Sequence, residues 1–418
     1  MERTYFCIDL KTFYASVECV VRGLNPFSTN LVVADPSRGK GAICLAISPC
    51  LKEQGVKNRC RVFDIPKDIE YITALPRMNL YIKYSADIYG IYLKFVAKED
   101  IHVYSIDEAF LDVTHYLKMY GLSKVDLAKK IIKAVYDETG ITAKCGIGTN
   151  LYLAKVALDI EAKKSEEGIG ILNEETFKEK LWRHRPLTDF WQIGRGISKR
   201  LEANGMYYLE DVAKQDEKLL YKLFGVNAEY IIDHAWGKEP CTIKQIKSYK
   251  SKSNSISSGQ VLFEDYDYDK ARLVVKEMAE LIALELTSKH LVCNNVSLSI
   301  GYSKDTNKST GGSVNLTNTT NSFRLLLPYF LSIFDNTTNK NLKIRKINIS
   351  CNNVVDEMYE YYDLFTDSDE ARKDVKLQKT IVDIKNKFGK NSIIRGMNLL
   401  EGATTKKRNK LVGGHNGD

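Results

Sequence analysis

The sequence lacks the features that mark membrane, secreted and fibrous proteins. No apolar run reaches the roughly 18 residues that a bilayer-spanning helix needs. The nine cysteines include no C-x-x-C pair, and the N-terminal stretch MERTYFCIDL carries charges where a signal peptide has an apolar centre. Internal repeats and low-complexity blocks are missing too. These absences predict a reduced, cytoplasmic protein without a membrane partner.

The composition also excludes a disordered chain. Hydrophobic residues make up 44% and charged residues 27% of the 418 residues, which is enough material for several folded cores. The formal net charge of +8 favours a polyanionic partner, although the same charge spread over the whole chain could serve solubility alone. The location of the basic residues therefore matters more than their number.

Two adjacent carboxylates interrupt a stretch that otherwise has the pattern of a strand. In 103-VYSIDEAFLDV-113, a continuous strand would send Asp107 and Glu108 to opposite faces, one of them into the core. A turn at this point would bring both carboxylates to one edge of a hairpin, where they repel by roughly 4 kcal/mol at an effective dielectric constant of about 20. A bound cation would remove this cost. The alternative is a turn with two solvated acids.

A third carboxylate is expected beside this pair. The stretch 5-YFCIDL-10 predicts a buried strand that leads directly into a helix, 11-KTFYASVECVV-21. A hairpin carrying Asp107 and Glu108 would pair beside this strand and meet Asp9. Three carboxylates suit Mg²⁺, which takes oxygen ligands and completes its shell with water and substrate phosphates. Two such ions can activate a hydroxyl nucleophile and neutralise leaving phosphates.

Further along the chain, the patterns indicate phosphate-binding elements. In 189-DFWQIGRGISKRLEANGMYYLEDVA-213, Gly194 and Gly196 form a G-x-G turn before a helix that Gly205 closes. This fits a helix-hairpin-helix whose turn amides hold a DNA phosphate; a plain helix turn is the alternative.

The polar segment 239–252 predicts a linker, and its Lys250 and Lys252 are candidate DNA contacts. Beyond it, strands and helices alternate in a way that predicts a small α+β sheet with helices on one face. Its basic loops could follow a phosphate backbone or form an ordinary solvated surface.

These motifs together resemble those of a known family. The stretches 9-DLKTFYASVE-18 and 105-SIDEAFLD-112, with 146-GIGTNLYLAKVA-157, are similar to the palm motifs of Y-family translesion DNA polymerases. Within that family they most resemble the branch of the bacterial DNA polymerase V catalytic subunit and the UV-damage repair proteins of Gram-positive bacteria. The resemblance extends over nearly the whole chain.

The resemblance implies an α+β multidomain protein with the right-hand polymerase architecture. Its parts would be a palm (1–25 and 77–168), small fingers (26–76), a helical thumb with the helix-hairpin-helix (169–238), a linker (239–252), an α+β little finger (253–360) and a C-terminal tail (361–418).

It also implies the roles of individual residues. The ligands of two Mg²⁺ ions would be Asp9, Asp107, Glu108 and the backbone carbonyl of Leu10. Tyr14 falls where the family places an aromatic steric gate against the 2′-OH of an incoming ribonucleotide. Phe13 would lie under the sugar of the incoming dNTP.

The predicted triphosphate contacts depart from the family pattern. Lys163 lies near the position of the family's triphosphate-binding lysine, but a one-residue offset leaves Lys164 open. In the fingers, where relatives have threonine, tyrosine and arginine, the stretch 45-LAISPCLKEQG-55 offers only Lys52 as a cation. A lysine supplies charge but no bidentate fork.

The function that the resemblance implies is low-fidelity, DNA-directed DNA synthesis across damaged templates, in DNA repair and SOS mutagenesis. The partners would be primer–template DNA, dNTPs, a sliding clamp and a recombinase filament. A nucleotidyl cyclase-like enzyme and a non-catalytic DNA-binding repair accessory protein are the alternatives.

The clamp is expected from one short peptide. The stretch 361-YYDLF-365 resembles the Q-L-[S/D]-L-F peptide by which bacterial polymerases dock on their sliding clamp, with Tyr361 and Tyr362 in place of Gln and Leu. Leu364 and Phe365 would be the apolar anchors. The alternative is a tail segment that packs on its own domain.

Overall fold

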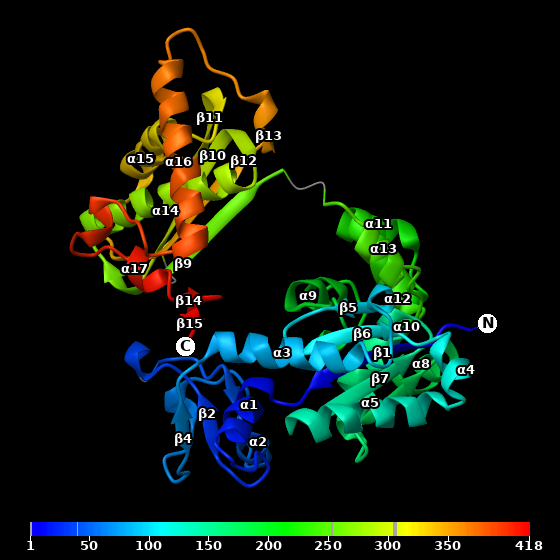
Figure 1. Ribbon diagram of the computed structural model, residues 1–418. Helices are drawn as coiled ribbons and strands as arrows, with labels where there is room; N and C mark the ends of the chain where they lie inside the picture. Colours follow the sequence, from blue (N-terminus) through cyan, green and yellow to red (C-terminus); the bar gives the residue numbers. More distant parts are fainter. Residues whose placement is uncertain (1, 40, 252–253, 304–306) are drawn as a thin grey trace. The chain divides into compact units, whose positions relative to one another are not determined.

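A computed structural model of the chain describes residues 2–39, 41–251, 254–303 and 307–418. The chain folds into two compact units, one of Met1–Lys250 with Asp418 and one of Ser251–Gly417 (Figure 1). The predicted DNA contact Lys252 lies outside the described residues. Among those residues, no helix combines the length and the apolar character that a membrane crossing requires.

A five-stranded sheet forms the centre of the first unit. Its order is β5-β6-β1-β7-β8, and every neighbouring pair is antiparallel except β7 and β8. The strands are β1 (Tyr5–Leu10), β5 (Ile101–Val103), β6 (Glu108–Asp112), β7 (Ala143–Gly148) and β8 (Ile169–Leu172). The strand predicted at 5–10 is confirmed, and it lies in the middle of this sheet.

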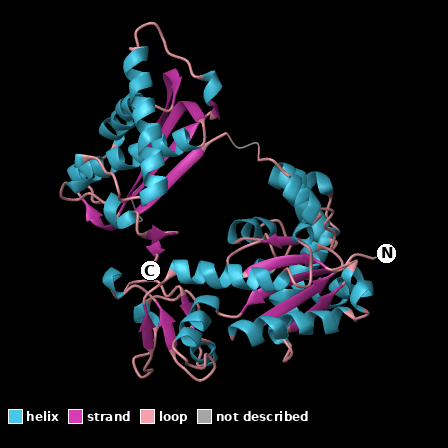
Figure 2. Cartoon of the chain, viewed as in Figure 1, coloured by secondary structure: helices cyan, strands magenta, loops and turns pink. Residues whose placement is uncertain are grey.

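Helices surround the sheet (Figure 2). They are α1 (Phe13–Val21), α3 (Met78–Tyr92), α4 (Tyr116–Tyr120), α5 (Lys124–Thr139), α6 (Leu151–Val156) and α7 (Ala162–Lys164). A π-helical turn, Ala157–Glu161, joins α6 to α7. Helix α6 packs on β1 and β7, and α5 packs on β7 and α3.

The close approach of α6 to the sheet depends on glycine. A Cβ atom added to Gly146 would lie 2.0 Å from the carbonyl oxygen of Ala154, and one added to Gly148 would lie 2.2 Å from the nitrogen of Ala154. Both obstacles are helix backbone, which cannot rotate aside as a side chain can. The two glycines of 143-AKCGIG-148 therefore let α6 lie directly on β7, so that its side chains reach the neighbouring strands.

The segments predicted as fingers and thumb flank this sheet within the first unit. The predicted fingers contain the three-stranded sheet β3-β2-β4. Their elements are β2 (Leu31–Val33), β3 (Ala46–Ile47), β4 (Ile72–Ala74) and α2 (Pro49–Glu53). The thumb helices are α8 (Glu174–Leu181), α9 (Arg195–Glu202), α10 (Leu209–Ala213), α11 (Glu217–Phe224) and α12 (Ala228–Ala235).

The second unit is a five-stranded sheet covered by helices, as the predicted small α+β domain requires; its fifth strand, the short β13, pairs with β10. The sheet order is β11-β10-β12-β9; α14 and α15 pack on the sheet, and α16 packs on both helices. The strands are β9 (Ile256–Tyr266), β10 (Leu291–Tyr302), β11 (Thr310–Thr320), β12 (Ile344–Asn352) and the short β13 (Val355–Asp356). The helices are α14 (Tyr268–Ser288), α15 (Phe323–Thr337), α16 (Ser368–Phe388) and α17 (Thr405–Arg408), followed by the hairpin β14 (Leu411–Val412) and β15 (His415–Asn416).

The structure differs from the predicted domain division in the linker. Part of segment 239–252 forms helix α13 (Ile243–Ser248). Thr242 and Gln245 form a capping box at its start, and Ile243 is buried against the core of the first unit. Ile246 packs against the same core. The many lysines around these two isoleucines gave the segment the composition of a polar linker.

The predicted C-terminal tail, 361–418, is also part of a folded unit. Gln378 of α16 is fully buried, where its side chain accepts the Phe323 N–H at 2.7 Å and donates to Thr287 Oγ1 at 2.8 Å. Because these partners belong to α14 and α15, the glutamine fixes α16 to the domain that the tail was expected to leave.

Candidate active site

The pairing of three strands puts two carboxylates and one lysine in a row. Asp9 of β1 lies directly opposite Glu108 of β6 on one side and opposite Lys144 of β7 on the other. Residues that face each other across antiparallel strands project from the same side of the sheet. Glu108, Asp9 and Lys144 therefore share one face, which is the face that α6 approaches.

The third predicted carboxylate stands at the turn before β6. The carbonyl oxygen of Asp107 accepts the N–H of Leu10 at 3.0 Å, so the turn is tied to the end of β1. The Asp107 carboxylate accepts a hydrogen bond from Ser105 Oγ at 2.6 Å. The hairpin turn expected at this acidic pair is confirmed, and it brings Asp107 to the strand that carries Asp9.

This environment disfavours a charged Asp9. Burial raises the pKa of Asp9 to about 7, and the negative charges of Glu108 and Asp107 contribute to the rise. A divalent cation would offset both effects, because it supplies opposite charge and replaces lost hydration. The donor chemistry of the three carboxylates thus fits a hard cation such as Mg²⁺.

Lys155 of α6 already neutralises part of this charge. Its Nζ lies 2.6 Å from Glu108 Oε1 and 3.1 Å from Asp159 Oδ2, and the side chain is buried. Burial alone would lower the pKa of Lys155, but the two carboxylates raise it above its ordinary value. In the part of the chain that the structure describes, no three His, Cys, Asp or Glu side chains already stand in metal-holding geometry.

The predicted steric gate stands at the start of α1. Tyr14 is half-buried and its ring stacks on Tyr81, with centroids 4.5 Å apart and planes 19° apart. Phe13 is only 3% exposed, so it belongs to the core. Thr12, just before the helix, has a left-handed backbone with φ of 48°, which is uncommon for a residue other than glycine. Of the two adjacent aromatic rings, Tyr14 is the accessible one.

A buried ionic network that the sequence analysis missed holds this gate. Tyr81 donates its hydroxyl to Glu18 Oε1 at 2.7 Å, and Arg77 binds the same carboxylate through two nitrogens, at 3.0 and 2.7 Å. Arg22 also contacts Glu18, which is fully buried. Because the ring of Tyr81 stacks on Tyr14, the network restricts the position of the predicted gate residue, Tyr14. Its signal in the sequence was an acid, Glu18, on the apolar face of a helix.

The predicted triphosphate lysine lies beyond the π-helical turn. A π turn accommodates one extra residue within a helix, which gives a physical reason for the one-residue offset at Lys163. Lys163 Nζ lies 3.4 Å from Asp159 Oδ1, so it shares with Lys155 the same neighbouring carboxylate. This geometry favours Lys163 over Lys164.

Other lysines gather beside the carboxylate row. Burial lowers the pKa of Lys144, and the positive charges of Lys11, Lys52 and Lys163 lower it further, whereas Asp9 raises it. The predicted contact Lys52, exposed in the last turn of α2, therefore lies near the palm lysines. Lys11 and Lys144 were not predicted.

The predicted DNA contacts of the thumb are exposed. Gly194 precedes α9 and Gly196 lies in its first turn, and a Cβ at either position would meet nothing within 4 Å. Neither glycine has a positive φ, so the turn does not need glycine for its conformation. Lys250 is exposed at the end of the first unit.

The predicted clamp peptide is held by its backbone and exposes its apolar side chains. Tyr361 exchanges two backbone hydrogen bonds with Thr319, at 2.9 and 3.0 Å, and the N–H of Asp363 donates to Asn318 Oδ1 at 2.7 Å. Leu364 is 98% exposed and Phe365 is 96% exposed. The segment thus packs on its own domain through its backbone, as the alternative expected, but the side chains of Leu364 and Phe365 do not take part in that packing.

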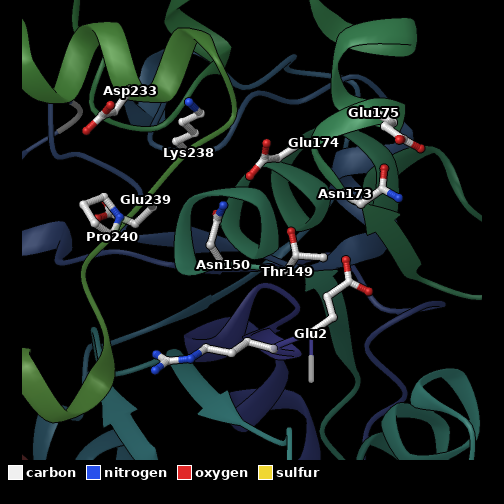
Figure 3. A pocket seen from close by; sticks show the side chains of 11 residues that line it. Glu2, Thr149, Asn150, Asn173, Glu174, Glu175, Asp233, Lys238, Glu239 and Pro240 are labelled. Atoms are coloured by element: carbon white, nitrogen blue, oxygen red, sulfur yellow. The ribbon is translucent and has the colours of Figure 1, made fainter.

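A separate cavity of about 700 Å³ lies between α8 and the segment after α12 (Figure 3). None of the predicted site residues lines it. Its wall includes Asn150, whose Nδ2 donates to the Gly237 carbonyl at 2.8 Å and whose Oδ1 accepts the Leu153 N–H at 2.8 Å. The amide of Asn150 is thus already used by the fold.

Comparison with known proteins gives a consistent result. The chain matches the impB/mucB/samB family over residues 8–159 and the C-terminal domain of that family over residues 253–364. It is 31% identical to UvrX of Bacillus subtilis, whose name assigns it to UV-damage repair, over 99% of this chain and 97% of that protein. It is 28% identical to DNA polymerase IV 2 of Halalkalibacterium halodurans, over 99% of this chain and 100% of that protein.

A solved structure shows the same fold. The Y-family DNA polymerase chimera of Dbh and Dpo4 superposes with a TM-score of 0.64 and 20% identity, over 84% of this chain and 99% of the chimera. The multidomain α+β polymerase architecture expected from the sequence is thereby confirmed. The chain belongs to the impB/mucB/samB family, the Y-family translesion polymerases that its palm motifs resemble.

The raised pKa of Asp9 predicts a pH-dependent stability of the metal-free protein. Below the unfolded pKa of 3.8, Asp9 is protonated in both states and has no effect on stability. As the pH rises from 3.8 to the folded value of about 7, Asp9 ionises in the unfolded state but keeps its proton in the folded state, so the free energy of unfolding falls. In EDTA at pH 8, Asp9→Asn should therefore raise the free energy of unfolding by up to about 4 kcal/mol. Thermal unfolding between pH 5 and 8.5 would measure this. Equal pH dependence in wild type and variant would contradict the assigned environment.

Proposed function

We propose that the chain extends a DNA primer by transfer of a nucleotidyl group at the carboxylates of Asp9, Asp107 and Glu108. The observation that carries the proposal is the strand register, which places Asp9 beside Glu108 and ties the Asp107 turn to Leu10. Membership of the family makes the chain a DNA-directed DNA polymerase of translesion synthesis and DNA repair. The full-length match does not favour a cyclase or a non-catalytic accessory protein.

The fold implies a divalent metal and dNTP substrates. We propose two Mg²⁺ ions, held by Asp9, Asp107, Glu108 and the Leu10 carbonyl. When bound, the metal would lower the pKa of the primer 3′-hydroxyl and neutralise charge on the phosphates. The half-buried, mutually repelling carboxylates support this assignment, because a cation stabilises such groups.

The remaining residues would orient the substrates. Lys163 and Lys52 would bind the triphosphate. The ring of Tyr14 would face C2′ of the sugar, and the buried ring of Phe13, which contacts the ring of Tyr14, would lie under the sugar. Primer–template DNA would be held through its phosphates, at Gly194 and Gly196 and by the lysines around Lys250. Discrimination by tight enclosure would be weak because the fingers are small, which fits synthesis on damaged templates.

The location and the further partners belong to the same proposal. A cytoplasmic location is supported by the nine cysteines, which are all free thiols. A recombinase filament is proposed on the resemblance to the DNA polymerase V branch alone.

Asp107→Ala should abolish nucleotide transfer while DNA binding stays within about twofold of wild type. The reason is that Asp107 would act only through the metal, whereas DNA is held elsewhere. Primer extension should fall below about 1% of wild type, a loss of more than roughly 3 kcal/mol of transition-state stabilisation. Asp137→Ala, which removes an exposed acid paired with Lys133, is the matched control. Extension well above that level by Asp107→Ala would refute the assigned role.

Tyr14→Ala should admit ribonucleotides. Removal of the ring opens space at C2′, and the rNTP/dNTP efficiency ratio should rise about 100-fold, equivalent to roughly 2.7 kcal/mol of lost discrimination. Steady-state insertion opposite one template base measures the ratio. If Phe13→Ala changes it strongly and Tyr14→Ala does not, the gate is the buried ring and the assignment to Tyr14 is wrong.

We also propose that Leu364 and Phe365 dock on a sliding clamp. Nearly complete exposure of two large apolar side chains on an anchored backbone supports a protein-binding peptide. The double variant Leu364→Ala/Phe365→Ala should weaken clamp binding at least tenfold in calorimetry and leave clamp-free extension unchanged. Leu399→Ala/Leu400→Ala removes comparable exposed apolar area and serves as the control. Equal clamp affinity of wild type and the first double variant would remove the docking role.

A further inference from the structure

The fingers of this chain offer one lysine, Lys52, where the related pattern has an arginine fork. A lone flexible ammonium is a weak substitute for bidentate phosphate binding. The structure, however, brings three other lysines together on the predicted palm: the Lys144 ammonium reaches the backbone of Ala162 and Lys163, and Lys11 is tied to Thr142 beside the start of β7. Four neighbouring positive charges repel one another, and a bound anion would offset that repulsion.

Lys144 has the best-defined position of the four. It lies opposite Asp9 on the next strand and on the same face of the sheet. Its Nζ donates to the carbonyl of Ala162 at 3.0 Å and contacts that of Lys163 at 3.4 Å. The ammonium therefore stands between the metal-binding carboxylate and the end of α7 that presents Lys163.

Lys11 approaches the same place from β1. It follows Leu10 directly, and its backbone N–H donates to the Thr142 carbonyl at 2.9 Å, which fixes it beside the start of β7. Its Nζ lies 4.7 Å from the centre of the Phe27 ring, at the entry to the fingers. The side chain thus reaches from the palm towards the finger segment that also carries Lys52.

Carboxylates on one side and lysines on the other form a charge pattern that matches a metal-bound nucleoside triphosphate. The metal would lie at Asp9, and the phosphates would extend away from it towards the cations. An anion between the lysines would remove their mutual repulsion, just as a cation would at the carboxylates.

We propose that Lys144, assisted by Lys11, binds the triphosphate of the incoming nucleotide together with Lys163 and Lys52. This inference rests on the proposed function and adds a palm-borne contact to it. Lys144 also orders the end of α7, so it positions Lys163 as well as contacting phosphate.

The test compares ligands that differ only in their phosphates. Binding of dATP and of dAMP is measured by calorimetry, with Ca²⁺ and a dideoxy-terminated primer–template so that no reaction occurs. Lys144→Ala should weaken dATP binding at least tenfold and change dAMP binding less than twofold. Lys144→Arg should restore dATP binding to within about threefold of wild type, because it retains the charge and the donors. In extension assays, KM for dNTP should rise at least tenfold while kcat falls only a few-fold.

Lys133→Ala on α5 is the matched control, because it removes an exposed lysine that is paired with Asp137 and is not part of the proposed phosphate site. It should behave as wild type. Unchanged dATP affinity in Lys144→Ala would overturn the inference, and so would an equal loss of dATP and dAMP binding, which would indicate a purely structural role. Those results would leave the polymerase function standing if wild type extends primers. Failure of wild type to bind dATP or extend a primer would refute the proposed function itself.

Discussion

The pairing of β1 with both β6 and β7 is the constraint on which the site depends. It fixes Glu108, Asp9 and Lys144 in one row, and a slip of one residue in either pair would turn a member of the row to the opposite face. The glycines of β7 add the second condition, because Gly146 and Gly148 admit the backbone of α6 to the same face. Strand register and helix contact thus bring together groups from distant parts of the sequence.

The electrostatics of the site follow from this arrangement. Burial and the acidic neighbours raise the pKa of Asp9, which favours its neutral form, whereas Lys155 forms an ion pair with Glu108. On the other side of Asp9, Lys144 lies near further positive charges, and burial together with these charges lowers its pKa. A metal–triphosphate complex carries both charges in the matching order. In the proposed site, such a substrate would therefore stabilise the carboxylates and the lysines, whose like charges repel in its absence.

The parts of the fold and site that could be predicted were those with local signals. An apolar strand run gave β1, and an acidic pair inside a strand pattern located the turn at Asp107. The steric-gate position of Tyr14 followed only from the family resemblance. Lys144 could not be found this way, because its role depends on which strand lies beside β1. The position of Tyr81 on α3 could not be predicted either, because it depends on a hydrogen bond to the buried carboxylate of Glu18 on α1. Helix α13 and the docking of α16 depend on a few buried side chains, among them Ile243 and Gln378, within polar surroundings.

The central claim is that Asp9 and Asp107 hold the catalytic metal while the lysine cluster takes the phosphates. The most direct measurement is a crystal structure of the protein with a dideoxy-terminated primer–template, dNTP and Mn²⁺, in which anomalous scattering locates the metal. The account predicts Mn²⁺ at about 2.1 Å from carboxylate oxygens of Asp9 and Asp107, with phosphate oxygens within hydrogen-bond distance of Lys144 and Lys163. Metal bound away from Asp9 and Asp107, or a triphosphate that leaves the palm lysines untouched, would contradict it.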